Sequence, residues 1–173
     1  MKKKNGFTLV ELLAVIVVLA LIMVIAIPSV LDVMNQARRS SFVEYSQKVI
    51  SNTLTEYAFD ANNTIPGAGR YVYDINQDLG SLHQGSYKGF VVVDASDVDK
   101  PVYYLTMWDD NYQIVNFDTS RGYPTNDTAQ IVPVEQETKN YTAIDVCGFN
   151  EYAGSCYNRQ GYMLKAATPS ETE

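Results

Sequence analysis

Hydrophobic residues are concentrated near the N-terminus, where an uninterrupted apolar run extends from Leu12 to Ile27 and continues beyond Pro28 to Leu31. A helix needs about 20 consecutive apolar residues to cross the hydrocarbon core of a bilayer. The pattern therefore predicts a membrane-spanning helix over residues 7–31.

After Pro28, apolar positions recur with helical spacing and polar residues fill the positions between them. A proline inside a helix removes one hydrogen bond and costs about 3 kcal/mol, so Pro28 is one candidate for the end of the membrane helix. We favour one long helix instead, because the apolar stripe continues on the far side of the proline. Its amphipathic part is predicted over residues 32–60. The stripe consists of Val30, Met34, Ala37, Val49, Ile50, Leu54 and Tyr57.

Beyond residue 61 the pattern changes to short alternating segments, which follow a turn-rich break. Segments rich in β-branched and aromatic residues predict strands. Three or four antiparallel strands leave a face of the sheet open, and we expect the amphipathic helix to cover it. The predicted fold class is α+β, with a long N-terminal helix packed on a small antiparallel β-sheet in residues 61–173. The predicted strands are residues 89–93, 101–108 and 112–117, with weaker candidates at 71–73 and 131–132.

Charge is distributed as unevenly as hydrophobicity. Lys2, Lys3 and Lys4 precede the apolar run, which by the positive-inside rule places the N-terminus in the cytoplasm and the following domain outside. The net charge of the chain is −7, so the residues after this lysine cluster carry −10. A surface of that kind repels phosphate backbones and argues against direct nucleic-acid binding.

Three ordinary interpretations of this N-terminal segment leave something unexplained. A cleaved secretory signal needs a small-x-small site after the apolar run, and Ile27-Pro28-Ser29 is a poor one. A lipoprotein signal needs a nearby cysteine, whereas the first cysteine is Cys147. A plain membrane anchor accounts for the hydropathy but gives no reason for a glycine and a glutamate at its edge.

The N-terminal residues K-K-K-N-G-F-T-L-V-E-L-L-A-V-I-V-V-L closely resemble the class III signal of type IV pilins and pseudopilins. In that family a membrane-embedded aspartyl protease, the prepilin peptidase, cuts on the cytoplasmic side after the glycine. The resemblance therefore implies that the leader, residues 1–6, is removed by cleavage between Gly6 and Phe7, and that the new Phe7 α-amine is methylated. The apolar run stays in the product.

Glu11 has two interpretations, which can hold in different states of the protein. Thr8-Leu9-Val10-Glu11 fits the S/T-x-x-E capping box, in which two side chains bind the first amides of a helix. A carboxylate in hydrocarbon also costs free energy unless a cation neutralises it. By resemblance to the pilins, Glu11 pairs with the Phe7 amine of a neighbouring subunit and sets the register of assembly. The same resemblance implies that Pro28 marks a point where the helix can melt when a filament forms.

Cys147 and Cys156 are the two cysteines of the chain, and both fall in the part predicted to lie outside the membrane. An even pair in an exported protein favours a disulfide over the alternatives, which are free thiols or a metal-binding pair. Such a bond would close a C-terminal disulfide loop and hold it against the sheet. Many pilins also fix their C-terminal region with a disulfide.

Motifs for catalysis or cofactor binding are weak. His83 is the sole histidine, and no nucleophile or oxyanion donor accompanies it. Asp94, Asp97 and Asp99 are weak calcium candidates, but they lack EF-hand spacing, and solvated hairpin aspartates explain them better. The sequence therefore predicts no enzyme activity, no cofactor and no firm metal site.

These observations predict a structural subunit of an extracellular type IV pilus or pilus-like filament that serves adhesion, motility or DNA uptake. The expected partners are the prepilin peptidase, an inner-membrane assembly platform, membrane lipid before assembly, and identical or related subunits afterwards. The protein would lie in the cytoplasmic membrane with its head outside, and later on the cell surface. The alternatives are a type II secretion pseudopilin and a membrane-anchored binding domain that never polymerises.

Overall fold

The chain is divided into two units in a computed structural model, an N-terminal unit, Met1–Ser40, and a head, Ser41–Glu173. Each unit is described by itself. The structure describes residues 8–65, 67–79, 87–126, 132–133 and 141–165.

A single helix, α1 (Leu9–Asn63), contributes to both units and contains Pro28 in its interior. The prediction of one long helix through the proline is therefore confirmed, and the amphipathic part ends three residues later than Asp60. In the head, the buried positions of α1 recur with helical spacing and include three polar residues. Two of these, Ser46 and Thr53, donate their hydroxyls to the carbonyls of Val43 and Val49, which satisfies them inside the core. The buried residues are Phe42, Val43, Tyr45, Ser46, Val49, Ile50, Thr53, Tyr57 and Asp60.

The head contains a seven-stranded sheet among its described residues, in the order β5-β4-β3-β2-β1-β6-β7. Neighbouring strands are antiparallel except for β1 and β6, which are parallel. The three firm strand predictions and the weaker one at 71–73 are confirmed, whereas β6 and β7 were not predicted. Of the candidate at 131–132, residue 131 lies outside the described residues. The strands are β1 (Arg70–Asp74), β2 (Lys88–Asp94), β3 (Val102–Trp108), β4 (Tyr112–Asp118), β5 (Val132–Pro133), β6 (Cys156–Asn158) and β7 (Met163–Lys165).

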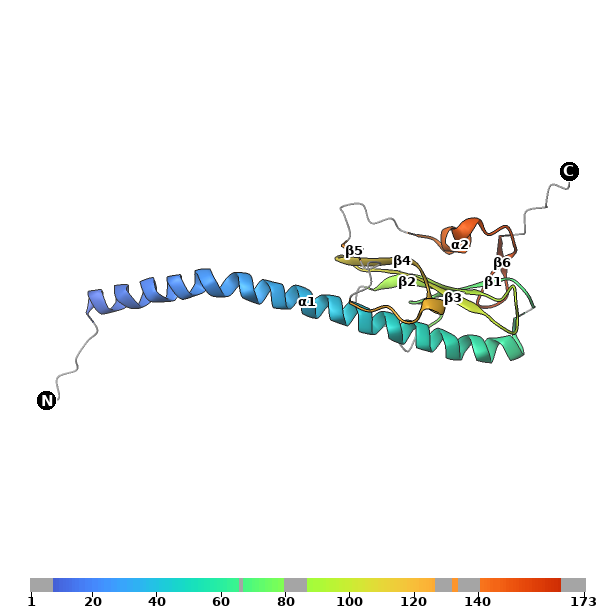
Figure 1. Ribbon diagram of the computed structural model, residues 1–173, viewed down its shortest axis with the longest axis horizontal. Helices are drawn as coiled ribbons and strands as arrows, with labels where there is room; N and C mark the ends of the chain where they lie inside the picture. Colours follow the sequence, from blue (N-terminus) through green and yellow to red (C-terminus); the bar gives the residue numbers. More distant parts are fainter. Residues whose placement is uncertain (1–7, 66, 80–86, 127–131, 134–140, 166–173) are drawn as a thin grey trace. The chain divides into compact units, whose positions relative to one another are not determined.

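One face of the sheet packs on the part of α1 that belongs to the head (Figure 1). Alternate strand residues point to this face, as the period-two pattern of a strand requires. Burial of such large apolar side chains contributes about 1.5–3 kcal/mol each. The fully buried strand residues of this core are Tyr71, Tyr73, Val91, Val93, Leu105, Met107 and Ile114.

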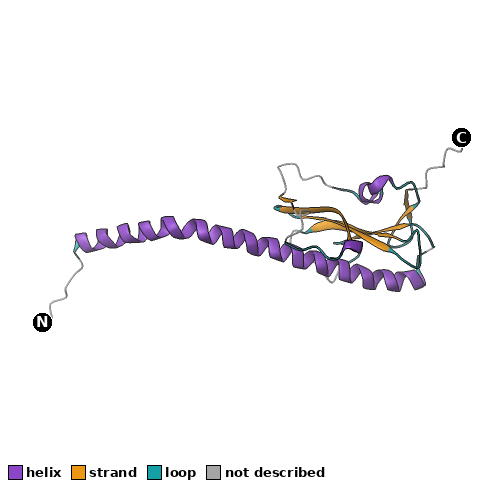
Figure 2. Ribbon diagram, in the orientation of Figure 1, coloured by secondary structure: helices purple, strands orange, loops and turns teal. Residues whose placement is uncertain are grey.

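The opposite face is covered by a second, smaller apolar cluster that the sequence did not predict. Figure 2 shows a short helix, α2 (Ala143–Cys147), on that side of the strands. Val72 and Val92 of the sheet pack there against Val146 and the two cysteines. Both faces of the sheet are therefore buried, one by α1 and the other by the C-terminal segment.

Two local features set the shape of the sheet. The pairing of β3 with β4 shifts register between Leu105 and Met107, and Asn116, which lies in the resulting bulge of β4, has a φ of 52°. Its amide donates to the Thr106 hydroxyl at 3.0 Å. Gly89 of β2 has a φ of +155°, and a Cβ at this position would overlap the carbonyl oxygen of Thr106. Only glycine fits there without displacement of β3.

Candidate processing and assembly site

The N-terminus of α1 is closed by a capping box between Thr8 and Glu11. The Thr8 amide and hydroxyl donate to Glu11 Oε2 at 2.8 Å and 2.9 Å, and the Glu11 amide donates to Thr8 Oγ1 at 3.3 Å. These bonds satisfy donors that a helix start otherwise leaves without partners. The capping box predicted from T-x-x-E is therefore confirmed.

The carboxylate of Glu11 retains capacity for a further donor. Both bonds from Thr8 converge on the same oxygen, Oε2. An ionised carboxylate can accept about four hydrogen bonds over its two oxygens. A cationic amine can therefore bind through Oε1 without breaking the cap, so capping and charge pairing are compatible in one geometry.

The proposed cleavage site lies immediately before this cap. Gly6 and Phe7, together with the leader lysines, lie outside the described residues. Thr8 is the first described residue, so the new amine that cleavage would create belongs to the residue next to the cap. The pairing of Glu11 with Phe7 stays a prediction.

The following turns of α1 expose apolar side chains around the whole helix. Large apolar residues from Leu9 to Met34 are exposed, including Val18 at 54% and Ile25 at 78%. A helix that is apolar on all sides needs an apolar environment. Among the described residues, α1 is the one helix long and apolar enough to cross a membrane, and none of its most apolar window is buried by the protein itself.

Pro28 lies within this exposed part of the helix. It has no N–H to donate to the carbonyl of Val24, so the helix lacks one hydrogen bond there. Helical geometry nevertheless continues on both sides of the proline. Its role as a melting point during assembly stays a prediction.

In the head, Cys147 and Cys156 form a disulfide, with 6.4 Å between their Cα atoms. Both residues are completely buried. The bond joins the end of α2 to the start of β6, so it attaches the cover of the second sheet face to the sheet itself.

Arg70 stabilises the same junction, a role that was not predicted from the sequence. Its guanidinium pairs with Asp94 at 2.8 Å and donates to the carbonyls of Cys147 and Phe149 at 3.0 Å and 2.7 Å. The ring of Tyr152 lies 4.0 Å from the guanidinium carbon. The partners of Arg70 are distant in the sequence. A basic residue at the start of a predicted strand therefore does not by itself indicate a buried ion pair.

A second arginine network was also missed, and it connects the β6–β7 turn to α1. Arg159 pairs with Glu56, and its Nε donates to Asp60 at 2.9 Å. Asp60 is buried and also accepts a hydrogen bond from the Tyr73 hydroxyl at 3.1 Å. The end of α1 is therefore fixed to the C-terminal hairpin by charge as well as by packing.

The carboxylates of two of the three calcium candidates, Asp94 and Asp97, already have partners within the protein. Asp94 binds Arg70 and also accepts from the Ser96 hydroxyl at 2.6 Å. Asp97 accepts from the Asp99 amide at 3.1 Å, which is an ordinary turn contact. Within the described ranges, no three acidic, histidine or cysteine side chains gather as a metal-binding group. His83 lies outside the described residues.

Comparison with known families adds one match at the N-terminus. Residues 1–27 match the family described as the prokaryotic N-terminal methylation motif. No curated protein and no solved structure matches the chain. The chain therefore carries a type IV pilin-like class III signal peptide at its N-terminus. The signal and the exposed apolar helix together fit a protein anchored in a membrane.

Proposed function

We propose that the chain is a structural subunit of an extracellular type IV pilus or a related filament, assembled from the membrane after removal of residues 1–6. The observation that carries the proposal is the methylation motif at residues 1–27, most of which lies in a helix that begins at Leu9 and has exposed apolar side chains on all sides. The role is assembly rather than catalysis. Prepilin peptidase and the assembly platform of the inner membrane would act on the chain before it reaches the cell surface.

The exposed apolar surface supports this role because it needs a partner in each state of the protein. Before assembly, lipid surrounds the side chains from Leu9 to Met34. In a filament, neighbouring copies of the same helix would replace the lipid. The exchange keeps apolar area out of water throughout, so the subunit can leave the bilayer without exposing it.

Glu11 would set the register in which neighbouring helices pack in the filament. Its carboxylate is held by Thr8 but can accept another donor, and the methylated amine of Phe7 in a neighbouring subunit would supply a cation. Charge-assisted bonds are roughly twice as strong as neutral ones, and they strengthen in an apolar environment. Subunits in the correct register would be favoured over those that leave the carboxylate unpaired.

The N-terminal peptide of the native protein tests the processing step. Mass spectrometry should find a chain that begins at methylated Phe7. A chain that still carries residues 1–6, in cells with active prepilin peptidase, would leave a static membrane anchor and contradict the proposal.

The charge-pairing step is tested with Glu11→Gln. Glutamine keeps the carbonyl acceptor for Thr8 but removes the charge, so the cap should survive while filament yield falls by at least tenfold. Glu44→Gln is the matched control, because Glu44 is an exposed residue of the same helix whose partner is Lys48. Normal filaments from Glu11→Gln would eliminate the pairing mechanism even if processing at Gly6 is correct.

A further inference from the structure

Two arginine side chains of the head, Arg70 and Arg159, occupy sites of similar composition. Arg70 lies between a carboxylate, Asp94, and the rings of Tyr152 and Tyr104, which are 4.0 Å and 5.5 Å from its guanidinium carbon. Carboxylate and aromatic face both attract a guanidinium group, the first by charge and the second by its quadrupole.

Arg159 occupies a second site of the same kind. It pairs with the carboxylates of Glu56 and Asp60, and its guanidinium carbon lies 5.9 Å from the centre of the Tyr73 ring. In both sites an arginine of the chain itself supplies the cation for a partly or fully buried carboxylate.

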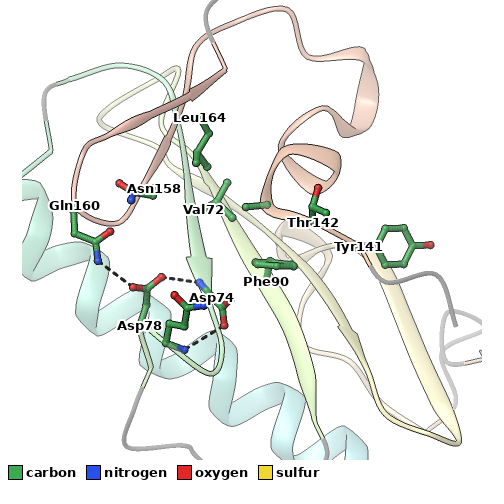
Figure 3. Close-up of a pocket in the computed structure, with 11 residues that line it drawn as sticks. Val72, Asp74, Asp78, Phe90, Tyr141, Thr142, Asn158, Gln160 and Leu164 are labelled. Carbon is green, nitrogen blue, oxygen red and sulfur yellow. Dashed lines mark hydrogen bonds between the residues drawn. The ribbon is translucent and has the colours of Figure 1, made fainter.

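A third site contains carboxylates and aromatic rings but no cation among its described lining residues. It is a pocket of about 450 Å³ between the start of α2, the β6–β7 turn and the turn that follows β1 (Figure 3). Phe90 and Tyr141 supply aromatic rings, and Asp74 and Asp78 lie at one end. No lysine or arginine is among the described residues that line it. Its volume is within the range of small-ligand sites, about 300–1,000 Å³.

The two carboxylates are held in place by neutral donors. Asp78 accepts from the Asp74 amide at 2.8 Å and from the Gln160 side chain at 3.4 Å. Asp74 accepts from the amide of Asn76 at 2.8 Å. Arg159 binds the backbone carbonyl of Asp78 rather than its carboxylate. Within the described part of the chain, neither carboxylate forms a salt bridge.

The Asp78 carboxyl is partly buried and has no ion-pair partner among the described residues. Burial raises the pKa of Asp78 above its ordinary value, and the hydrogen bond from the Asp74 amide and the charge of Arg159 offset this only in part. Ionisation of Asp78 is therefore less favourable in the protein than in water, and a cation placed in the pocket would offset this difference.

We propose that this pocket binds an arginine side chain presented by another protein. The two acidic groups favour a cation and repel anionic ligands such as nucleic acids and phosphate headgroups. The rings of Phe90 and Tyr141 offer apolar surface to the arginine stem and π-faces to its guanidinium group. The inference concerns the head alone and does not depend on filament assembly.

Trp108 provides a reporter for the test. It is the one tryptophan of the chain, and its ring centre lies 6.2 Å from that of Phe90 and 5.6 Å from that of Tyr141. The full chain in detergent micelles is titrated with N-acetyl-arginine amide, and its tryptophan emission is recorded. N-acetyl-citrulline amide is the matched probe, because citrulline has nearly the same shape without the charge. We expect saturable binding of the arginine probe, at least about tenfold tighter than that of citrulline.

Isosteric variants locate the binding site. Asp74→Asn combined with Asp78→Asn should lower the affinity for the arginine probe about tenfold. The amide oxygens still accept the local hydrogen bonds but carry no charge. Asp97→Asn is the control, since it removes an exposed charge from a similar turn outside the pocket. Near-ultraviolet circular dichroism verifies that each variant is folded.

Several outcomes would overturn the proposal. Equal responses to arginine and citrulline would show that charge is not recognised, and an equal loss in Asp97→Asn would show that binding is not local. A saturable response to calcium chloride that displaces the arginine probe would assign the pocket to a divalent cation. Emission that changes with protein concentration alone would assign it to a second copy of the chain.

Discussion

The two parts of α1 have the same backbone conformation but opposite surfaces. Up to Ser40 the helix exposes its apolar side chains around the whole circumference, whereas from Ser41 onward its large apolar side chains, apart from the exposed Phe59, pack in the core beneath the sheet. A proline is tolerated in the first part, and buried hydroxyls bonded to the preceding turn occur in the second. Helical backbone conformation alone therefore does not show which environment a segment occupies. The distribution of apolar and polar side chains around the helix shows it.

The pairing of Glu11 differs in sequence range from that of the two arginine networks in the head. In the N-terminal unit, Glu11 is held by a residue three positions away. In the head, Arg70 and Arg159 bind partners between 24 and 103 residues away along the chain. Local pairing would suit the proposed transfer of this segment from lipid into a filament, because it does not depend on either environment. Long-range pairing fixes one folded state.

Arg70→Ala should cause the largest loss of stability in the head. It removes the partner of Asp94 and of two carbonyls at the disulfide junction, and breaking a buried pair costs about 3–5 kcal/mol. Urea unfolding of the full chain in detergent, followed by Trp108 emission, measures the change. Arg121→Ala, at an exposed arginine, should leave the midpoint unchanged. Equal effects of the two variants would mean that the buried network contributes nothing.

Val18→Asp should have a comparable effect in the N-terminal unit, but on membrane insertion rather than on unfolding. An aspartate near the middle of a membrane helix costs about 2.5–3.5 kcal/mol on insertion scales. The variant should therefore shift from the membrane fraction, whereas Ser51→Asp, at an exposed position of the same helix in the head, should stay there. Full retention of Val18→Asp in the membrane fraction would contradict the inference that this surface of the helix contacts lipid.

Removal of the disulfide should cause the next largest loss of stability. In the chain-entropy model, a loop with a separation of nine residues contributes about 2.5–3 kcal/mol. Cys147→Ser combined with Cys156→Ser should lower the stability of the head by that amount while the long helix persists in far-ultraviolet circular dichroism. An unchanged urea midpoint would show that Arg70 and the second apolar cluster hold the junction without the bond.

The contrast between local and distant contacts also explains what the sequence could predict. The capping box, the long helix and the central strands are determined by neighbours within a few residues, and all were predicted. β6 and β7 have three residues each, too few for a periodic pattern, and α2 has five. The one available signal for α2 was Thr142-Ala143-Ile144-Asp145, whose T-x-x-D spacing forms a second capping box. The partners of Arg70 and Arg159 depend on the fold and left no local pattern.

Acid should weaken the head through Asp94, by less than the loss of Arg70. Burial alone would raise the pKa of this carboxyl, but hydrogen bonds from Ser96 and Arg70 and the charge of Arg70 together hold it below its ordinary value. The resulting stability is complete above the unfolded pKa of about 3.9 and is lost as the pH falls through the lower folded value. Asp94→Asn should therefore flatten the dependence of the urea midpoint on pH below about 4. A parallel curve for the variant would exclude Asp94 as a source of acid sensitivity.

The smallest effect should come from the ion pair on the exposed side of the amphipathic helix. Glu44 and Lys48 are 2.8 Å apart, but both side chains are more than half exposed, so water and salt screen their attraction. Lys48→Ala should leave the urea midpoint within experimental error, and added salt should not change that result. Arg159→Ala in parallel should lower the midpoint clearly, because it leaves the buried Asp60 without its cation. If Lys48→Ala instead destabilises the head as much as Arg159→Ala does, burial is not what distinguishes the pairs that fix the fold from those that cover its surface.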